Sequence, residues 1–133
     1  MKHIAKVFVA LAVASLLLIG PGALAVTNVN TILKLEANKT QVSKGGKVQF
    51  TIHLKASKRK CKAGQPLKWY RNGVYKKTFT TDSTGTVQFN KGVKATSKYF
   101  AKFPGAKVGT HPNRLNCQPS TSTTIRIKVK PGS

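Results

Sequence analysis

The strongest constraint on the fold is a strict alternation of apolar and polar side chains in the middle of the chain. Val48, Phe50, Ile52 and Leu54 are apolar, and the residues between them are polar. Successive side chains of a β-strand point to opposite faces, so this segment has one apolar and one polar face. It therefore predicts a strand that packs on a core with one face and meets solvent with the other.

The same alternation recurs along the chain, and helical periodicity is almost absent. Between turn residues it predicts seven strands. Their ranges are 31–37, 47–55, 66–71, 74–80, 86–90, 97–103 and 123–130. Asn72-Gly73 predicts a type I′ hairpin turn, because both residues accept positive φ angles. The stretch 104–122 is expected to be a long loop, because its glycines and prolines interrupt a ladder or weaken it.

Seven short strands within about 100 residues, with Trp69 on the third, predict an all-β fold, an immunoglobulin-like sandwich of two antiparallel sheets. A small barrel is the alternative. The apolar residues at alternating positions are expected to point inward. They are Leu33, Leu35, Val48, Phe50, Ile52, Leu54, Leu67, Trp69, Val87, Phe89, Tyr99, Ala101, Phe103, Ile125, Ile127 and Val129.

Residues 1–25 have the features of a secretory signal peptide. Basic residues precede an apolar run, 7–19, and Ala23-Leu24-Ala25 fits a signal-peptidase site. The run is short for a membrane span. The alternative is a retained membrane anchor, although no stop-transfer pattern follows. We therefore expect a secreted, extracellular product, residues 26–133, that is one domain without a membrane span.

The chain is extremely basic, with 24 Lys and Arg against two acidic residues and a net charge of +22. The expected product carries +20, because Lys2 and Lys6 leave with the signal peptide. Such a charge opposes association, so we expect a monomer, and it attracts polyanions. Lysines far outnumber arginines, which favours diffuse attraction over base-specific readout. The expected partners are an anionic polysaccharide or wall polymer, a cell-surface protein, or nucleic acid bound without sequence preference.

The two cysteines, Cys61 and Cys117, predict a disulfide bond, because an exported chain meets an oxidising environment. Free thiols or half of a metal site are the alternatives, although no further metal-ligand motif accompanies either cysteine. In the predicted strand order both cysteines lie in loops at one end of the sandwich. The usual position of an antibody inter-sheet disulfide is instead occupied by residues such as Ile52 and Ala101.

Two basic surfaces are candidate anion-binding sites. The first surrounds the predicted disulfide and comprises Lys58, Arg59, Lys60, Lys62, Lys107 and Arg114. The second is the outward row of the last strand, beside Lys98 and Lys102, and comprises Arg126, Lys128 and Lys130. The alternative is that a chain this rich in lysine has cations everywhere. Tyr70 and Phe100 can stack on sugars or bases if they are exposed, and are otherwise covered by neighbouring side chains.

Catalytic groups are scarce. General acid–base pairs need two groups close together, and the chain has only Glu36 and Asp82. A hydrolase triad would need His111 with Asp82 and a loop serine such as Ser57 or Ser120, and no nucleophile-elbow motif is present. We therefore predict that the protein is not an enzyme and has no catalytic residue, metal or cofactor.

Three segments resemble the third, fourth-to-fifth and sixth strands of bacterial immunoglobulin-like repeat modules. They are Trp69-Tyr70-Arg71-Asn72-Gly73, the stretch from Thr80 to Phe89, and Tyr99-Phe100-Ala101-Lys102-Phe103-Pro104-Gly105. The resemblance implies a β-sandwich of the kind used in surface and secreted proteins for spacing, adhesion or ligand binding, here as a single secreted domain. It carries over no catalytic residues.

Three functional hypotheses follow. The first is a secreted, non-enzymatic binding module that attaches to anionic polymers at a cell surface or in the extracellular matrix. The second is a secreted effector or inhibitor that acts on a target protein through the two disulfide-linked loops. The third is a structural surface module without a ligand.

Overall fold

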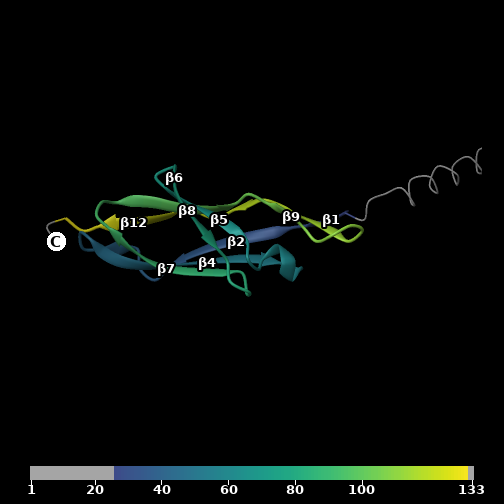
Figure 1. Cartoon of the computed structure of the whole chain (residues 1–133). Coiled ribbons are helices and arrows are strands. Elements are labelled where there is room, and N and C mark those ends of the chain that lie inside the picture. The colour runs from purple at the N-terminus through teal and green to yellow at the C-terminus, as the bar shows by residue number, and fades with distance from the viewer. Residues whose placement is uncertain (1–25, 132–133) are drawn as a thin grey trace, which may run out of the picture.

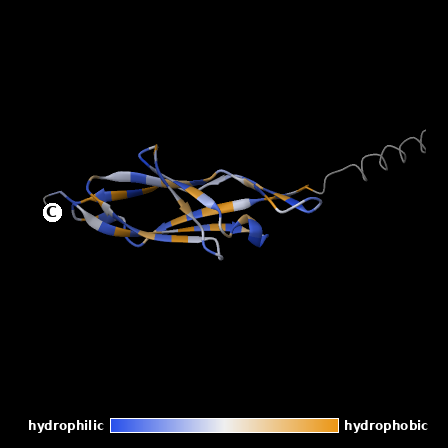
Figure 2. Ribbon diagram, in the orientation of Figure 1, coloured by the Kyte–Doolittle hydropathy of each residue, from blue (hydrophilic) through white to orange (hydrophobic). Residues whose placement is uncertain are grey.

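Two β-sheets face one another in the computed structural model, which describes residues 26–131 (Figure 1). The predicted signal peptide lies outside the described residues. Within residues 26–131 there is no helix with the length and apolar character needed to cross a membrane. Figure 2 shows apolar and polar residues alternating along strands of both sheets, as the sequence predicts.

The smaller of the two facing sheets contains the strand with the strict alternation. Its strands, in order across the sheet, are β2 (Thr31–Ala37), β4 (Gly46–Ala56) and β7 (Thr86–Val93). All its pairs are antiparallel. The four apolar side chains of β4, from Val48 to Leu54, are at most 1% exposed. Strand β7 runs further than the predicted 86–90, because Val93 is also a buried core residue.

The larger sheet contains five strands in sequence across it and a short sixth. They are β3 (Gln41–Val42), β12 (Ile125–Val129), β8 (Ser97–Phe103), β5 (Pro66–Arg71) and β6 (Val74–Thr80), with β11 (Ser120–Thr121) also paired with β8. The turn between β5 and β6 has φ angles of 50° at Asn72 and 79° at Gly73. The predicted Asn-Gly turn is thus confirmed in its positive φ angles.

A third, small sheet and a short 3₁₀ helix lie at one end of the sandwich (Figure 1). The sheet consists of β1 (Val26–Val29), β10 (Arg114–Cys117) and β9 (Ala106–Val108), and the helix is η1 (Arg59–Cys61). The prediction of a structureless loop over 104–122 is therefore wrong, since β9, β10 and β11 lie in it. Gly109 supplies the positive φ of 87° at the turn between β9 and β10, so the glycine separates short strands and does not prevent them.

Two strand pairs depart from the expected antiparallel arrangement. Strand β1 runs parallel to β10, and β3 runs parallel to β12. The chain therefore leaves the smaller sheet after β2 and joins the larger one as β3. Neither β1 nor β3 was predicted, because each has a single buried residue, Val29 and Val42 respectively, and so shows no alternation.

The core between the two sheets is rich in aromatic residues. Phe50 of β4 lies with its ring centroid 4.9 Å from that of Trp69 on β5 and 5.0 Å from that of Tyr99 on β8. Ile52 and Ala101, which occupy the usual position of an antibody disulfide, are both fully buried. The predicted two-sheet, immunoglobulin-like sandwich is confirmed, and the alternative of a single closed barrel is not what the chain forms.

Candidate functional site

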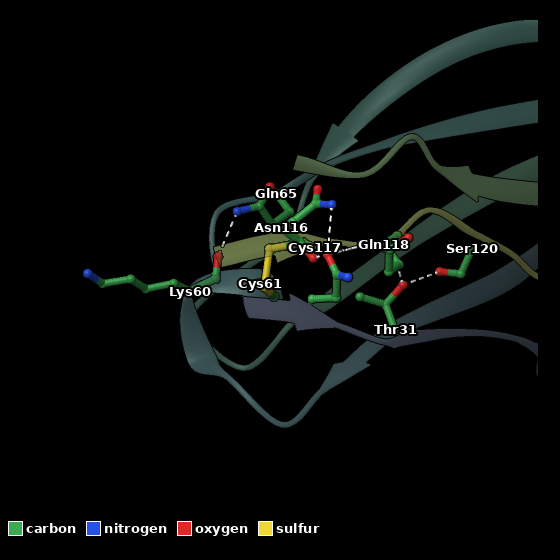
Figure 3. Close-up of a disulfide and its surroundings, with 9 residues drawn as sticks. Thr31, Lys60, Cys61, Gln65, Asn116, Cys117, Gln118 and Ser120 are labelled. Atoms are coloured by element: carbon green, nitrogen blue, oxygen red, sulfur yellow. Dashed lines mark hydrogen bonds between the residues drawn. A yellow bond between two sulfur atoms is a disulfide. The ribbon is translucent and has the colours of Figure 1, made fainter. Parts of the chain in front are cut away.

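The end of the sandwich that contains η1 is held by a disulfide bond. Cys61 ends η1, Cys117 ends β10, and the bond joins them with their Cα atoms 5.4 Å apart (Figure 3). Both cysteines are at most 1% exposed. The bridge therefore links the connection between β4 and β5 to the connection between β8 and β12, as the sequence predicts.

Hydrogen bonds of two buried polar residues, Gln65 and Thr81, attach a third connection to the same end. The Gln65 side chain donates to the carbonyl of Lys60 over 2.8 Å, and the Gln65 N–H donates to the Thr81 hydroxyl over 2.8 Å. That hydroxyl in turn donates to the carbonyl of Lys62 over 2.6 Å. The chain just after β6 is thus fixed to the chain just before β5. We call the region formed by residues 57–65, 81–85 and 106–117 the disulfide pole.

The first described strand also belongs to this region of the molecule. Val26 lies opposite Arg114, and the Asn116 side chain donates to the Asn28 side-chain oxygen over 3.0 Å. The Thr31 hydroxyl lies 2.7 Å from the carbonyl oxygen of Gln118, to which it donates (Figure 3). Strand β1 therefore supports β10 from the side opposite β9.

Both acidic residues of the chain are used in local contacts. One oxygen of Asp82 accepts hydrogen bonds from the Thr84 hydroxyl (2.7 Å), the Thr84 N–H (2.8 Å) and the Thr86 N–H (3.0 Å). These bonds, that of the Thr84 hydroxyl first, lower the pKa of Asp82. Lys34 lies 2.9 Å from Glu36 and lowers the pKa of that carboxyl by hydrogen bonding and charge. This is the one ion pair within residues 26–131.

Five of the six cations predicted around the disulfide belong to segments that lie close to it. Lys58, Arg59 and Lys60 are exposed at η1, Lys62 is half-buried, and Lys107 is exposed on β9, which contacts η1. In Figure 3 the Lys60 side chain points away from the disulfide. Arg114 is further out, because it begins β10 three residues before Cys117, roughly 10 Å along the strand.

The predicted outward row is exposed on the larger sheet. It consists of Arg126 and Lys128 on β12 and of Lys130 just after it. Arg126 lies directly opposite Lys98 on β8. Four residues further along β8, Lys102 lies directly opposite Lys68 on β5. Like charges in directly opposed positions destabilise a sheet, so each of these two pairs opposes folding.

Aromatic side chains lie between the two like-charge pairs. Phe100 on β8 is opposite Tyr70 on β5, and their rings stack with centroids 4.8 Å apart and planes 3° apart. Tyr75 on β6 continues the row, edge-on to Tyr70 at 6.0 Å, and is 50% exposed. The Lys102 ammonium lies 5.3 Å from the Tyr70 ring centroid and 5.8 Å from that of Phe100.

Tyr70 and Phe100 are half-buried, so each remains in part accessible while its neighbours cover the rest. Sequence reasoning missed two members of this surface, Lys68 and Tyr75. Their placement depends on the pairing of β5 with β8 and on a register shift between Trp69 and Tyr70 where β5 pairs with β6. We call the surface the cationic–aromatic face. Its members are Lys68, Tyr70, Tyr75, Lys98, Phe100, Lys102 and Arg126.

No protein-family model matches the sequence, and no curated protein matches it at a significant level. Two solved structures of the CARDB domain of the PF1109 protein from Pyrococcus furiosus are similar in shape. The solution NMR structure is 10% identical over 77% of this chain and 96% of that chain, with a TM-score of 0.48. The crystal structure, a complex with di-metal ions, is 13% identical over 74% and 91%, with a TM-score of 0.43.

Similarity at this level carries no functional information about the present chain. The metal ions belong to the Pyrococcus protein. Within residues 26–131 no group of three or more His, Cys, Asp or Glu side chains is placed so that it can hold a metal. The resemblance to bacterial immunoglobulin-like repeats stays a prediction beyond the sandwich fold itself.

Proposed function

We propose that this chain is a secreted, non-enzymatic binding module that attaches to anionic polymers at a cell surface or in the extracellular matrix. The observation that carries the proposal is the cationic–aromatic face, where an aromatic row lies between two like-charge pairs on one open sheet surface. The proposed secretion rests on the signal-peptide pattern of residues 1–25.

The like-charge pairs are easier to understand if a bound polyanion neutralises them. Lys68 and Lys102 repel one another, as do Lys98 and Arg126, and no acidic residue is opposite either pair in the strand register. Lysine richness alone produces some opposed cations, but here two such pairs lie on either side of one stacked aromatic pair on the same sheet surface. A ligand that brings negative charge to both pairs removes the repulsion and gains the attraction.

The spacing of the face suits a polymer with a ring between charged groups. Lys98 and Lys102 each lie two residues from Phe100 along β8, roughly 7 Å away along the strand. Aromatic side chains stack on bases and sugars with little preference for sequence. Anionic polysaccharide, wall polymer and single-stranded nucleic acid all offer such groups.

Salt-dependent retention on immobilised heparin tests the proposal, because counterion release makes polyanion binding weaken steeply as salt rises. The variant Lys68→Glu/Lys102→Glu reverses two charges on the face. Its matched control, Lys44→Glu/Lys47→Glu, reverses two exposed charges near the turn before β4 and gives the same net charge. We expect the face variant to elute at a clearly lower salt concentration than the control variant.

Equal elution of the two variants would show that net charge alone, and not this face, retains the protein. A wild-type protein that ignores heparin, anionic wall polymer and single-stranded DNA at low salt would refute the proposed function as a whole.

The contribution of the rings can be separated from that of the charges. Phe100→Ser leaves every cation in place and removes one stacked ring. Since stacking on an aromatic ring contributes about 1–3 kcal/mol per base, we expect about a tenfold weaker affinity for single-stranded DNA with little change in the salt dependence. Circular dichroism at the assay temperature checks that the variant is folded. An unchanged affinity would limit the site to its cations.

The disulfide pole supports a second candidate, a secreted effector or inhibitor that blocks an acidic site of a target protein. Its loops are held by the Cys61–Cys117 bond, which reduces the ordering cost of binding. This candidate predicts a saturable complex of fixed stoichiometry that survives physiological salt. Charge reversal at Lys58, Arg59 and Lys60 would abolish that complex while leaving heparin retention largely intact.

A further inference from the structure

A cleft opens between the two sheets on the side of β6 and β7, away from the cationic–aromatic face. Its volume is about 360 Å³. Residues of β5, β6, β7 and β8 line it, so it reaches from the edge of the sandwich towards the aromatic core. A volume of this order accommodates a small molecule, and it lies at the lower end of the range of ligand-binding pockets.

The walls of the cleft are aromatic. Trp69, Phe79, Phe89 and Tyr99 all line it. Their rings contact one another, with centroid distances of 4.9 Å between Trp69 and Phe89, 4.3 Å between Phe79 and Phe89, and 5.2 Å between Trp69 and Tyr99. These contacts hold the rings in place, so the cleft is preorganised to receive another flat ring.

Two of these nearly buried aromatic side chains, Trp69 and Tyr99, also carry a polar atom. Trp69 is 3% exposed and Tyr99 is 1% exposed. No fully buried side-chain nitrogen or oxygen in the described part lacks a partner. The indole N–H and the tyrosine hydroxyl are therefore each hydrogen-bonded or in contact with accessible space, and both side chains line the cleft.

The remaining polar lining is almost entirely cationic. It consists of Arg71, Lys76, Lys77 and Lys91, together with Asn90. Lys77 lies opposite Trp69 across the β5–β6 pair, and its ammonium is 5.0 Å from the centroid of the Phe79 ring. No carboxylate lines the cleft, and both acidic residues of the chain are engaged elsewhere.

Ammonium, guanidinium and indole groups donate hydrogen bonds and accept none. A cleft lined by such donors and by low-dielectric aromatic walls concentrates positive potential at its mouth. It is therefore complementary to a ligand whose polar atoms are negatively charged acceptors and whose remaining surface is a ring.

We propose that this cleft is a binding site for a small anion, a carboxylate or phosphate ester carried on a single ring. The ring lies against Trp69 and Phe89, and the anionic group meets Lys77, Lys91 and Arg71. This site is separate from the polymer-binding face, because it lies between the sheets and the face lies on the outer surface of the larger sheet. It accepts one terminal group and not the interior of a chain.

Trp69 is the only tryptophan of the chain and reports on the cleft directly. The probe is benzyl phosphate, titrated into the oxidised protein while Trp69 fluorescence is recorded, with equilibrium dialysis as an independent readout. We expect a saturable change with benzyl phosphate, weaker binding of inorganic phosphate, which lacks the ring, and no binding of benzyl alcohol, which lacks the charge.

The variant Lys77→Ala removes one cation of the cleft, and the matched control Lys68→Ala removes one from the outer face of the same sheet. Loss of one charge-assisted hydrogen bond is expected to weaken benzyl phosphate binding roughly tenfold for Lys77→Ala and to have no effect for Lys68→Ala. Equal affinity in both variants, or equal binding of benzyl alcohol and benzyl phosphate, would overturn the proposal. Heparin retention should fall for Lys68→Ala, which removes a cation of the cationic–aromatic face, and should stay closer to that of the wild-type protein for Lys77→Ala. Failure of the cleft proposal is therefore distinct from failure of polymer binding.

Discussion

Removing the disulfide should cost this small domain a large part of its stability. The bond joins residues 56 apart in sequence, and both cysteines are buried. In the chain-entropy model, a bond that closes a loop of about 56 residues lowers the conformational entropy of the unfolded chain. The folded state is thereby stabilised by about 4 kcal/mol relative to the unfolded state. The perturbation is Cys61→Ala/Cys117→Ala, which keeps both positions apolar and leaves no free thiol.

The assay is equilibrium unfolding in urea followed by circular dichroism. A loss of about 4 kcal/mol, at an m-value of about 1.5 kcal/mol/M, lowers the unfolding midpoint by between about 2 and 3 M. Mass spectrometry of the wild-type protein, which should be lighter by two hydrogens than its reduced form, first establishes that the bond is present. Reductant should destabilise the wild-type protein by a similar amount and leave the double variant unchanged.

The reasoning fails if the double variant unfolds within about 1 kcal/mol of the oxidised wild-type protein, since the model requires about four times that loss. Such a result would mean that the unfolded chain is restrained by something other than the bond, for example by residual structure in the denatured state.

Two further predictions concern the turn at 82–85. Gly85 has a φ of 86°, and a Cβ there would lie 2.5 Å from the carbonyl oxygen of Leu54. Gly85→Ala should therefore destabilise the fold by about 2 kcal/mol or more. The control is Gly73→Ala, whose added Cβ has open space around it and which should cost clearly less. Urea unfolding of both variants measures the difference. The pKa of Asp82 is lower in the folded state than in the unfolded state, where it is near 3.8. The ionised carboxylate therefore stabilises the folded state at pH values above 3.8. This contribution is lost as the pH falls through the lower pKa of the folded state. At pH 7 the thermal unfolding midpoint of Asp82→Asn should thus lie below that of the wild-type protein. At pH 2 the two midpoints should converge. A difference between the midpoints that does not change with pH would contradict this reasoning.

The sequence predicted the strands that bury alternating apolar residues, because burial of one face determines both the type and the register of such a strand. The range 97–103 matches β8, and 66–71 matches β5. Short strands with one buried residue carry no such signal. Strands β9 and β10 exist because the hairpin is held at Cys117 and along β1, and those contacts are remote in sequence.

The predicted disulfide required only that the loops at one end of the sandwich meet, and strand order determines that. The cleft was not predicted at all, although each of its aromatic residues was placed on an inward face or on a predicted strand. A cleft depends on how far two sheets separate at an edge, and at this edge Phe79 and Phe89 pack against one another with 4.3 Å between their ring centroids.

The cationic–aromatic face, our proposed polymer-binding surface, could not be located from charge alone in a chain of this composition. Alternation correctly places Lys68, Lys98 and Lys102 on outward positions, but it says nothing about which of them are opposite one another. Strands β5 and β8 are not consecutive, and their register follows from the pairing of Trp69 with Ala101 in the core. Because the buried residues fix that register, they also force Lys68 against Lys102 and Phe100 against Tyr70. The core therefore determines the pattern of the outer face, and a core substitution that shifts β5 relative to β8 should weaken polyanion binding without removing a single charge.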